Sequence, residues 1–145
     1  SIIIEESISW SVGLAEPEEI DRINILQASL LAMKRALNTF DLTSSKTFIL
    51  VDGNRIINTI PNHMQQAVIK GDSKSASIAA ASIIAKVTRD RIMEKYDEKY
   101  PLYQFARHKG YPTTIHREKI LKFGLSLIHR RSFCEKMLSQ IKLDI

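Results

Sequence analysis

The chain has 145 residues, of which 44% are hydrophobic and 26% are charged, as is usual for a single globular domain with its own core. Its one cysteine, Cys134, excludes an internal disulfide framework. The sequence shows no signal sequence and no apolar run long enough to span a membrane. We therefore expect a cytoplasmic protein without a membrane partner.

The charge is unevenly distributed. Residues 1–65 hold five Lys or Arg and eight Asp or Glu, a net charge of −3. Residues 66–145 hold sixteen and eight, a net charge of +8. This asymmetry favours a polyanionic partner for the second half, although a solvated basic surface is a common alternative.

Two patterns fill the first forty residues. Every second residue from Ile8 to Leu14 is apolar, which predicts a strand with one buried face. Pro17 fits the first turn of a short helix. Apolar residues at spacings of three and four then predict a longer helix over about residues 22–39.

Acidic residues follow two predicted strands. Residues 46–51 are nearly continuously apolar, as in a strand covered on both faces, and Asp52 comes directly after them. A second strand is predicted over residues 66–69, with Asp72 in the turn that follows, residues 71–75. Ligands bind at the carboxyl ends of strands in open α/β sheets, so these carboxylates could hold divalent cations.

Each carboxylate also has a structural alternative. Asp72 could be the N-cap of the next helix, in competition with Ser73 or Ser75. Asp52 and Gly53 could form the type I′ turn of a hairpin, although no alternating strand follows at hairpin distance.

Helices are predicted for the remaining chain. The first ten residues of the helix over residues 76–99 are nearly all apolar, which predicts that it is buried, and Pro101 ends it. Residues 103–112 form a predicted loop, followed by a helix over residues 114–123. Short helices are predicted over 126–133 and 135–143. The order of elements indicates an α/β fold.

Six motifs occur in a fixed order between about Trp10 and Phe133. They are Asn24-Ile-Leu-Gln-Ala, Leu50-Val-Asp-Gly-Asn, Ile69-Lys-Gly-Asp-Ser-Lys-Ser, Ala80-Ala-Ser-Ile-Ile-Ala-Lys-Val-Thr-Arg-Asp-Arg, His108-Lys-Gly-Tyr and His129-Arg-Arg-Ser-Phe. In these motifs the chain resembles ribonuclease HII, the bacterial type 2 ribonuclease H. The resemblance implies a ribonuclease H-like mixed sheet flanked by helices, with a C-terminal helical extension. Residues 1–100 would belong to the catalytic core and residues 101–145 to the extension, packed as one domain.

The resemblance also implies an activity. A ribonuclease HII cleaves RNA in RNA–DNA hybrids and at single ribonucleotides embedded in duplex DNA, leaving 3′-hydroxyl and 5′-phosphate ends. Asp52 and Asp72 would be two of four acidic ligands that hold Mg²⁺ or Mn²⁺, two ions in the intact enzyme, and would take part in catalysis. The intact enzyme is expected to be a monomer.

One departure limits this expectation. The family begins with a strand that carries an adjacent Asp-Glu pair, followed by a Gly-Arg-Gly turn and later a Ser-Lys-Lys segment, and none of these occurs here. We therefore expect the chain to correspond to the C-terminal two-thirds of the enzyme and to be inactive alone. Two alternatives stay open: a catalytically incompetent basic nucleic-acid-binding fragment, and an α/β domain with a protein partner. Salt dependence of binding would separate them.

The loop from His108 to Tyr111 is basic and ends in an aromatic residue. Lys109 can meet a phosphate, and Tyr111 can stack on a sugar or base. The resemblance implies that Tyr111 senses the junction between a ribonucleotide and the next deoxyribonucleotide; a tyrosine packed at the domain edge is the alternative. Lys86 and Arg89, one helical turn apart, are equally consistent with phosphate contact and with a surface pair.

The other candidate residues give weaker signals of function. His116 and His129 are expected to lie too far apart, and without partner ligands, to form a zinc site. Cys134 is expected to be a small buried residue and not a nucleophile.

Overall fold

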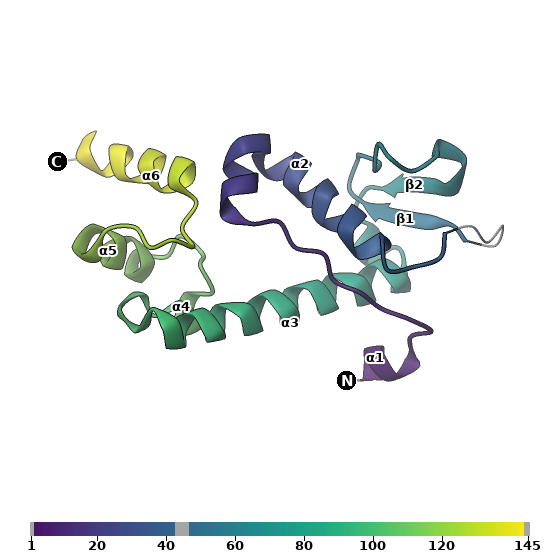
Figure 1. Cartoon of the computed structure of the whole chain (residues 1–145), viewed down its shortest axis with the longest axis horizontal. Helices are drawn as coiled ribbons and strands as arrows, with labels where there is room; N and C mark the ends of the chain where they lie inside the picture. The colour runs from purple at the N-terminus through teal and green to yellow at the C-terminus, as the bar shows by residue number, and fades with distance from the viewer. Residues whose placement is uncertain (1, 43–46, 144–145) are drawn as a thin grey trace. The chain divides into compact units, whose positions relative to one another are not determined.

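The computed structural model of the chain describes residues 2–42 and 47–143, which form a mixed α/β structure (Figure 1). Its helices and strands are α1 (Ile2–Glu6), α2 (Pro17–Leu37), β1 (Ile49–Asp52), β2 (Gln65–Val68), α3 (Ala76–Lys99), α4 (Phe105–His108), α5 (Thr114–Phe123) and α6 (Arg131–Leu143). The predicted α/β class is confirmed, since helices accompany a parallel sheet.

The chain divides into two compact units. The first comprises the described residues of Ser1–Ala15 and Ile23–Lys86, and the second those of Glu16–Arg22 and Val87–Ile145. The predicted division into a core over residues 1–100 and an extension over 101–145 concerns function and stays a prediction.

The sheet of the first unit is a parallel pair. β1 and β2 lie side by side (Figure 1), with Ile49 opposite Gln65 and Asp52 opposite Val68. β2 lies within one residue of its predicted bounds. β1 ends one residue after its predicted end but begins later than predicted, because residues 47–48 are not in a strand and residue 46 is outside the described residues. Because the strands are parallel, their carboxyl ends meet at the same edge.

The prediction that the first strand is covered on both faces is wrong. Val51 is buried, but the side chains of Phe48 and Leu50 are 54% and 39% exposed. Side chains alternate between the faces of a strand, so burial of Val51 alone indicates one covered face. In the described part of the chain, two strands of four residues give too little sheet to hold a second layer.

Helix α3 occupies the predicted range 76–99, but its predicted burial is wrong. Ile78 is the one buried residue of this fully described helix, while Ile83 is 50% and Val87 is 42% exposed. A helix that is apolar nearly all round needs neighbours on several sides. The exposure of Ile83 and Val87 shows that such neighbours are lacking among the described residues.

The predicted strand over residues 8–14 is also wrong. Residues 7–15 form no regular structure, and the side chain of Ile8 is fully exposed. A strand requires a neighbour to pair its amides and carbonyls, and no described strand pairs with this segment. Instead, Gly13 packs against the backbone of α2, and Arg35 donates a hydrogen bond to the carbonyl oxygen of Leu14 at 2.6 Å.

Gly13 is therefore expected to be sensitive to substitution. A Cβ atom at this position would lie 1.9 Å from the carbonyl oxygen of Ala32 and 2.6 Å from the amide nitrogen of Ala36, and backbone atoms cannot move aside cheaply. We expect Gly13→Ala to destabilise the first unit by roughly 1–3 kcal/mol. Urea unfolding followed by the fluorescence of Trp10 measures the loss. Ser9→Ala, at an exposed position of the same segment, is the matched control, and equal midpoints for both variants would contradict the packing of Gly13.

The first helical region follows the prediction closely. The predicted short helix at Pro17 and the longer helix after it form α2, but Asn24 has non-helical dihedral angles of φ 66° and ψ 165°. The Asn24 side chain accepts a hydrogen bond from the amide of Gln27 at 3.1 Å, as an N-cap does at the start of a new helix. The helix ends at Leu37, two residues before the predicted end.

A buried glutamine was not predicted. Gln65, at the start of β2, is 5% exposed and accepts a hydrogen bond from the amide of Ile57 at 2.8 Å. Its amide group also donates to the carbonyl oxygens of Ile57 and Ile60. A buried polar group is stable only when its partners are present, so Gln65 holds the connection between β1 and β2 in place.

The second unit contains a small apolar core. Ile120 and Cys134 are buried, with Leu125 and Leu138 packed against them. The expected burial of Cys134 is confirmed, and this burial raises the pKa of its thiol. Helix α5 has the predicted bounds and begins after Thr113, whose side chain accepts a hydrogen bond from the amide of His116.

Two predictions for the second unit are wrong. The expected loop 103–112 contains α4, and the helix expected over 126–133 does not begin until Arg131. The range 135–143, which was expected to be helical, lies within α6. Asp21, from a distant part of the chain, accepts hydrogen bonds from the hydroxyl of Ser132 at 2.5 Å and from its amide at 3.2 Å. These bonds lower the pKa of Asp21 and satisfy an amide in the first turn of α6, a partner that local sequence does not reveal.

Candidate functional site

Asp52 lies at the carboxyl end of β1 and is exposed. Its Oδ1 atom accepts a hydrogen bond from the amide of Gly71 at 2.8 Å. Asp72 is the next residue, also exposed, and its Oδ1 atom accepts from the amide of Ser73 at 2.9 Å. The structure therefore brings the turn that carries Asp72 to the end of β1, where the sequence placed Asp52.

The turn depends on Gly71. A Cβ atom there would lie 2.6 Å from the Cδ1 atom of Ile78 and 3.1 Å from the Oδ1 atom of Asp52. Lys70 precedes it with a left-handed backbone (φ 54°), which turns the chain sharply after β2. Glycine at residue 71 thus allows the close approach of Asp52 to the turn that carries Asp72.

The structural alternatives for these carboxylates do not match the geometry. The amide of Gly53 donates to the carbonyl oxygen of Val68 at 3.0 Å and continues the parallel ladder, so Asp52 and Gly53 do not form a hairpin turn. Asp72 lies in a short 3₁₀ turn, Gly71–Ser73, and bonds the adjacent amide, so it does not cap α3.

The carboxylate oxygens of Asp52 and Asp72 are of the type that binds a hard divalent cation, but two carboxylates are few for a complete site. Each carboxylate uses Oδ1 for a backbone amide, and no hydrogen bond or ion pair engages Oδ2 of either among the described residues. Carboxylate oxygens are the ligands that Mg²⁺ and Mn²⁺ prefer. However, the described residues contain no group of three or more His, Cys, Asp or Glu that could hold a metal ion. The carboxylates of Asp52 and Asp72 therefore suit such an ion in their chemistry, and their role as metal ligands stays a prediction.

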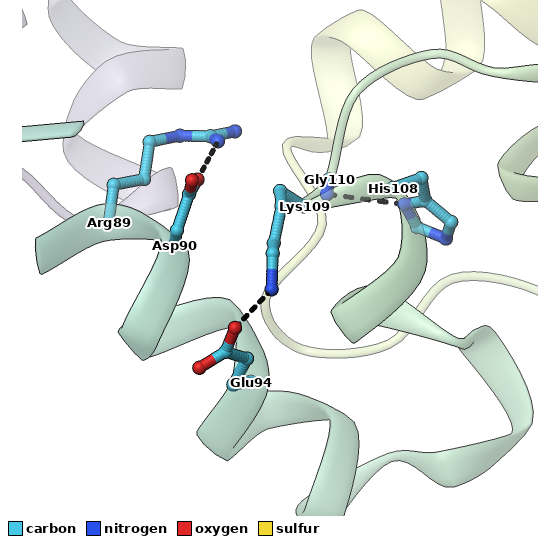
Figure 2. A network of polar contacts seen from close by, with 6 residues as sticks. All are labelled: Arg89, Asp90, Glu94, His108, Lys109 and Gly110. Atoms are coloured by element: carbon cyan, nitrogen blue, oxygen red, sulfur yellow. Dashed lines mark hydrogen bonds and ion pairs between the residues drawn. The ribbon is translucent and has the colours of Figure 1, made fainter. Parts of the chain in front are cut away.

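The second unit carries the predicted basic loop. Lys109 and Gly110 both have positive φ angles, 50° and 76°, and together form a tight turn after α4. The Nζ atom of Lys109 lies 2.5 Å from the Oε1 atom of Glu94 on α3 (Figure 2). The side chain of Lys109 is 21% exposed and that of Glu94 is 56% exposed, so solvent screens this ion pair.

Tyr111 follows this turn with its ring in contact with an arginine. The Cζ atom of Arg89 lies 4.6 Å from the centroid of the Tyr111 ring, a cation–π contact. The Nη1 atom of Arg89 lies 3.9 Å from the Oδ1 atom of Asp90 (Figure 2). Tyr111 is 52% exposed, so half of its surface is accessible, and its role in recognition stays a prediction. The structure thus gathers Arg89, Lys109 and Tyr111 on one surface.

Lys86 is exposed and stands three residues before Arg89 on α3. Lys86 belongs to the first unit and Arg89 to the second. A shared role for the two stays a prediction that rests on their spacing.

The expectation that His116 and His129 lie far apart is wrong. Their Nε2 atoms are 3.0 Å apart, and both side chains are buried. Burial lowers the pKa of His116, and burial with the nearby His116 lowers the pKa of His129 to about 4. A third buried histidine, His108, stacks on His116 with ring centroids 4.2 Å apart. The one sequence signal for this cluster was that all three belong to the second half of the chain, which does not predict contact.

Two further findings bear on the kind of protein. Among the described residues, no helix combines the length and apolarity needed to cross a bilayer. The family model described as Ribonuclease HII matches residues 3–136, nearly the whole chain.

Proposed function

Because the chain belongs to the ribonuclease HII family, whose members are ribonuclease H-type nucleases, we propose that it supplies part of the active site of a metal-dependent endoribonuclease. The proposed substrates are RNA in RNA–DNA hybrids and single ribonucleotides embedded in duplex DNA. The proposed products carry 3′-hydroxyl and 5′-phosphate ends.

The observation that carries this proposal is the hydrogen bond between Asp52 and the amide of Gly71, which brings two exposed carboxylates to one edge of the sheet. Asp52 and Asp72 would hold Mg²⁺ or Mn²⁺ through their Oδ2 atoms. Bound ions of this kind supply activation of water and stabilisation of the leaving oxygen. The role of the chain itself would be to orient the two carboxylates through the backbone amides that their Oδ1 atoms accept.

The basic surface formed by Arg89, Lys109 and Tyr111 would bind the nucleic acid. An exposed ion pair is worth only about 0–1 kcal/mol, so a phosphate can replace Glu94 as the partner of Lys109. The exposed face of Tyr111 is available for stacking on a sugar or base, while Arg89 supports the ring. Lys86 would add a further phosphate contact.

A second candidate function has one observation in its favour. The described residues contain no group of three or more His, Cys, Asp or Glu that could hold a metal ion, so the chain alone could bind nucleic acid without cleaving it. In that case binding would weaken steeply with added salt, as phosphate contacts do.

The test compares two proteins on one substrate. The first is residues 1–145, and the second, the extended protein, has a family strand with the Asp-Glu pair joined before residue 1. A duplex with one ribonucleotide is incubated with each in Mg²⁺ or Mn²⁺, and the ends of the products are analysed. We expect cleavage by the extended protein, with 3′-hydroxyl and 5′-phosphate ends, and little or none by residues 1–145. An all-DNA duplex is the control. Absence of cleavage by a folded extended protein would overturn the proposed activity.

Tyr111 provides a separate prediction. In the extended protein, Tyr111→Ala should reduce cleavage at a single ribonucleotide by roughly 5- to 150-fold, because stacking on one base is worth about 1–3 kcal/mol. Cleavage within a long hybrid should fall less, since many ribonucleotides can be presented. Tyr111→Phe is the matched control, because it keeps the ring and removes the hydroxyl. Equal losses on both substrates would reduce Tyr111 to a general packing residue.

A further inference from the structure

Three buried histidines form a connected group behind the exposed Tyr111. His108, His116 and His129 are 5%, 7% and 7% exposed and surround the ring of Phe105, whose centroid lies 5.5–5.7 Å from each of theirs. Buried imidazoles without partners are costly, so each ring nitrogen must be accounted for. Every one of the six nitrogens has a partner within 3.2 Å.

The partners determine where the protons lie. The Nδ1 atom of His116 lies 3.0 Å from the carbonyl oxygen of Tyr111, which can only accept, so Nδ1 carries the proton. The Nε2 atom of a neutral His116 then accepts, and the Nε2 atom of His129 donates to it across 3.0 Å. The Nδ1 atom of His129 must accept, and it receives the amide of Ser126 at 2.9 Å and its hydroxyl at 2.7 Å.

The hydrogen-bond partners of His108 define its tautomer in the same way. Its Nε2 atom donates to the carbonyl oxygen of Tyr103 at 2.9 Å, and its Nδ1 atom accepts from the amide of Gly110 at 3.2 Å (Figure 2). All three rings are therefore neutral with one defined tautomer each. No ring nitrogen keeps a free lone pair, which leaves none to bind a metal, and burial keeps all three rings from direct contact with a nucleic acid.

This group holds the backbone of the loop that carries Tyr111. The carbonyl oxygen of Tyr111 accepts from His116 and also from the amide of Thr113 at 2.8 Å. The amide of Tyr111 donates to the carbonyl oxygen of His108 at 2.8 Å, and the preceding amide of Gly110 bonds the ring of His108. Both polar groups of the Tyr111 peptide backbone are thus fixed, while the ring itself remains half exposed.

We propose that His116 is a positioning residue for substrate recognition: its Nδ1–H group fixes the carbonyl of Tyr111, and His129 and Ser126 keep His116 in the donating tautomer. The inference rests on the proposed function, because Tyr111 is taken there to contact the nucleic acid. A loop backbone that is fixed before binding loses less conformational freedom when the Tyr111 ring stacks, which favours the correctly shaped junction. Specificity at Tyr111 would depend on a residue that never touches the substrate.

The test uses two substitutions at His116 that differ in which nitrogen they imitate. His116→Asn places an amide N–H near the position of Nδ1 and can keep the bond to Tyr111. His116→Gln reaches toward the position of Nε2 and loses that bond. His63→Asn and His63→Gln, at an exposed histidine in the first unit, are the matched controls. All variants are made in residues 1–145.

Two measurements test separately whether the Tyr111 carbonyl is held in place and whether this affects the binding of nucleic acid. Hydrogen exchange of the Thr113 amide reports on the Tyr111 carbonyl whether or not nucleic acid binds. Fluorescence anisotropy gives the ratio of Kd values for a labelled all-DNA duplex and the same duplex with one ribonucleotide. We expect His116→Asn to stay within about twofold of wild type in both readouts. In His116→Gln we expect the Thr113 amide to exchange about tenfold faster, and we expect the two duplexes to bind with similar Kd values.

The outcomes distinguish this inference from the proposed function. Equal behaviour of His116→Asn and His116→Gln, whether both keep or both lose the two properties, would overturn the positioning role. A wild type that binds both duplexes equally would instead overturn the proposed recognition by this chain, and Thr113 exchange would then decide the role of His116 alone. If His116→Gln fails to fold, Ser126→Ala tests the same series of bonds: faster Thr113 exchange supports it, and unchanged exchange contradicts it.

Discussion

Replacement of Asp72 or Asp52 by asparagine is expected to lower Mg²⁺-dependent cleavage by the extended protein at least about 100-fold. Residues that merely orient metal ligands typically contribute about 10- to 100-fold, so a ligand should contribute at least as much. Asparagine keeps the shape of the side chain and its Oδ1 acceptor but replaces the charged Oδ2 atom. The rate of cleavage at a single ribonucleotide, at saturating Mg²⁺, is the measurement.

Measurements of stability show whether a loss of cleavage comes from the lost carboxylate or from unfolding of the variant. The Oδ1 atom of asparagine can still accept the bond from the amide of Gly71, so Asp52→Asn should unfold at the same urea concentration as wild type. Asp52→Ala removes the acceptor and should cost about 1 kcal/mol. Glu98→Gln, at an exposed position near the end of α3, controls for the loss of a negative charge. Full activity in both asparagine variants would remove Asp52 and Asp72 from the proposed metal site.

The parts of the fold that local sequence predicts are those with local signals. The end of α3 is set by Pro101 and the end of α5 by Gly124, whose φ angle is 76°, and both helices have their predicted ranges. The two short strands were also predicted, because β1 is an apolar run followed by Asp-Gly and β2 ends just before the turn at Gly71. In each case the residues that define the element lie within it or next to it.

The predictions that failed concern partners distant in the sequence. Alternation from residue 8 to 14 is compatible with a strand, but pairing requires a neighbour, and Gly13 packs on α2 instead. The start of α6 depends on Asp21, which is 111 residues from Ser132. The apolar composition of α3 leads to burial only if enough sheet exists to cover the helix. The exposure of Ile83 shows that the first unit does not provide that cover.

The residues of the candidate site also differ in whether a local sequence signal could predict them. Asp52 and Asp72 were predicted as a pair because both follow strands, and parallel pairing brings strand ends together. The contact between Arg89 and the Tyr111 ring joins α3 to a later loop, and spacing alone could not predict it. The histidine group was missed because His116 and His129 come from different segments and meet only after the chain folds.

That group leads to the second large expected effect, a loss of stability in mild acid. The pKa of His129 is lowered from 6.5 to about 4 in the folded protein, chiefly by burial and then by the nearby His116, and the pKa of His116 is lowered in the same direction. Between about pH 6.5 and pH 4 the unfolded chain binds a proton at His129 that the folded chain does not bind. Stability contributed by neutral His129 is therefore present above pH 6.5, falls as the pH is lowered toward 4, and changes no further below that value.

The size of this effect makes it measurable. At about 1.4 kcal/mol for each tenfold change in proton affinity, His129 alone accounts for about 3 kcal/mol, and His116 adds to it. Asp21 acts in a separate window, because its lowered pKa removes stability only below its ordinary value of 3.8. Urea unfolding followed by circular dichroism, at several values between pH 7.5 and 4.2, isolates the histidine contribution. His129→Gln should flatten the slope, since it cannot bind a proton, whereas His63→Gln should retain the wild-type slope. Parallel curves for wild type and a folded His129→Gln would show that the neutral histidine group does not contribute to the stability of the second unit.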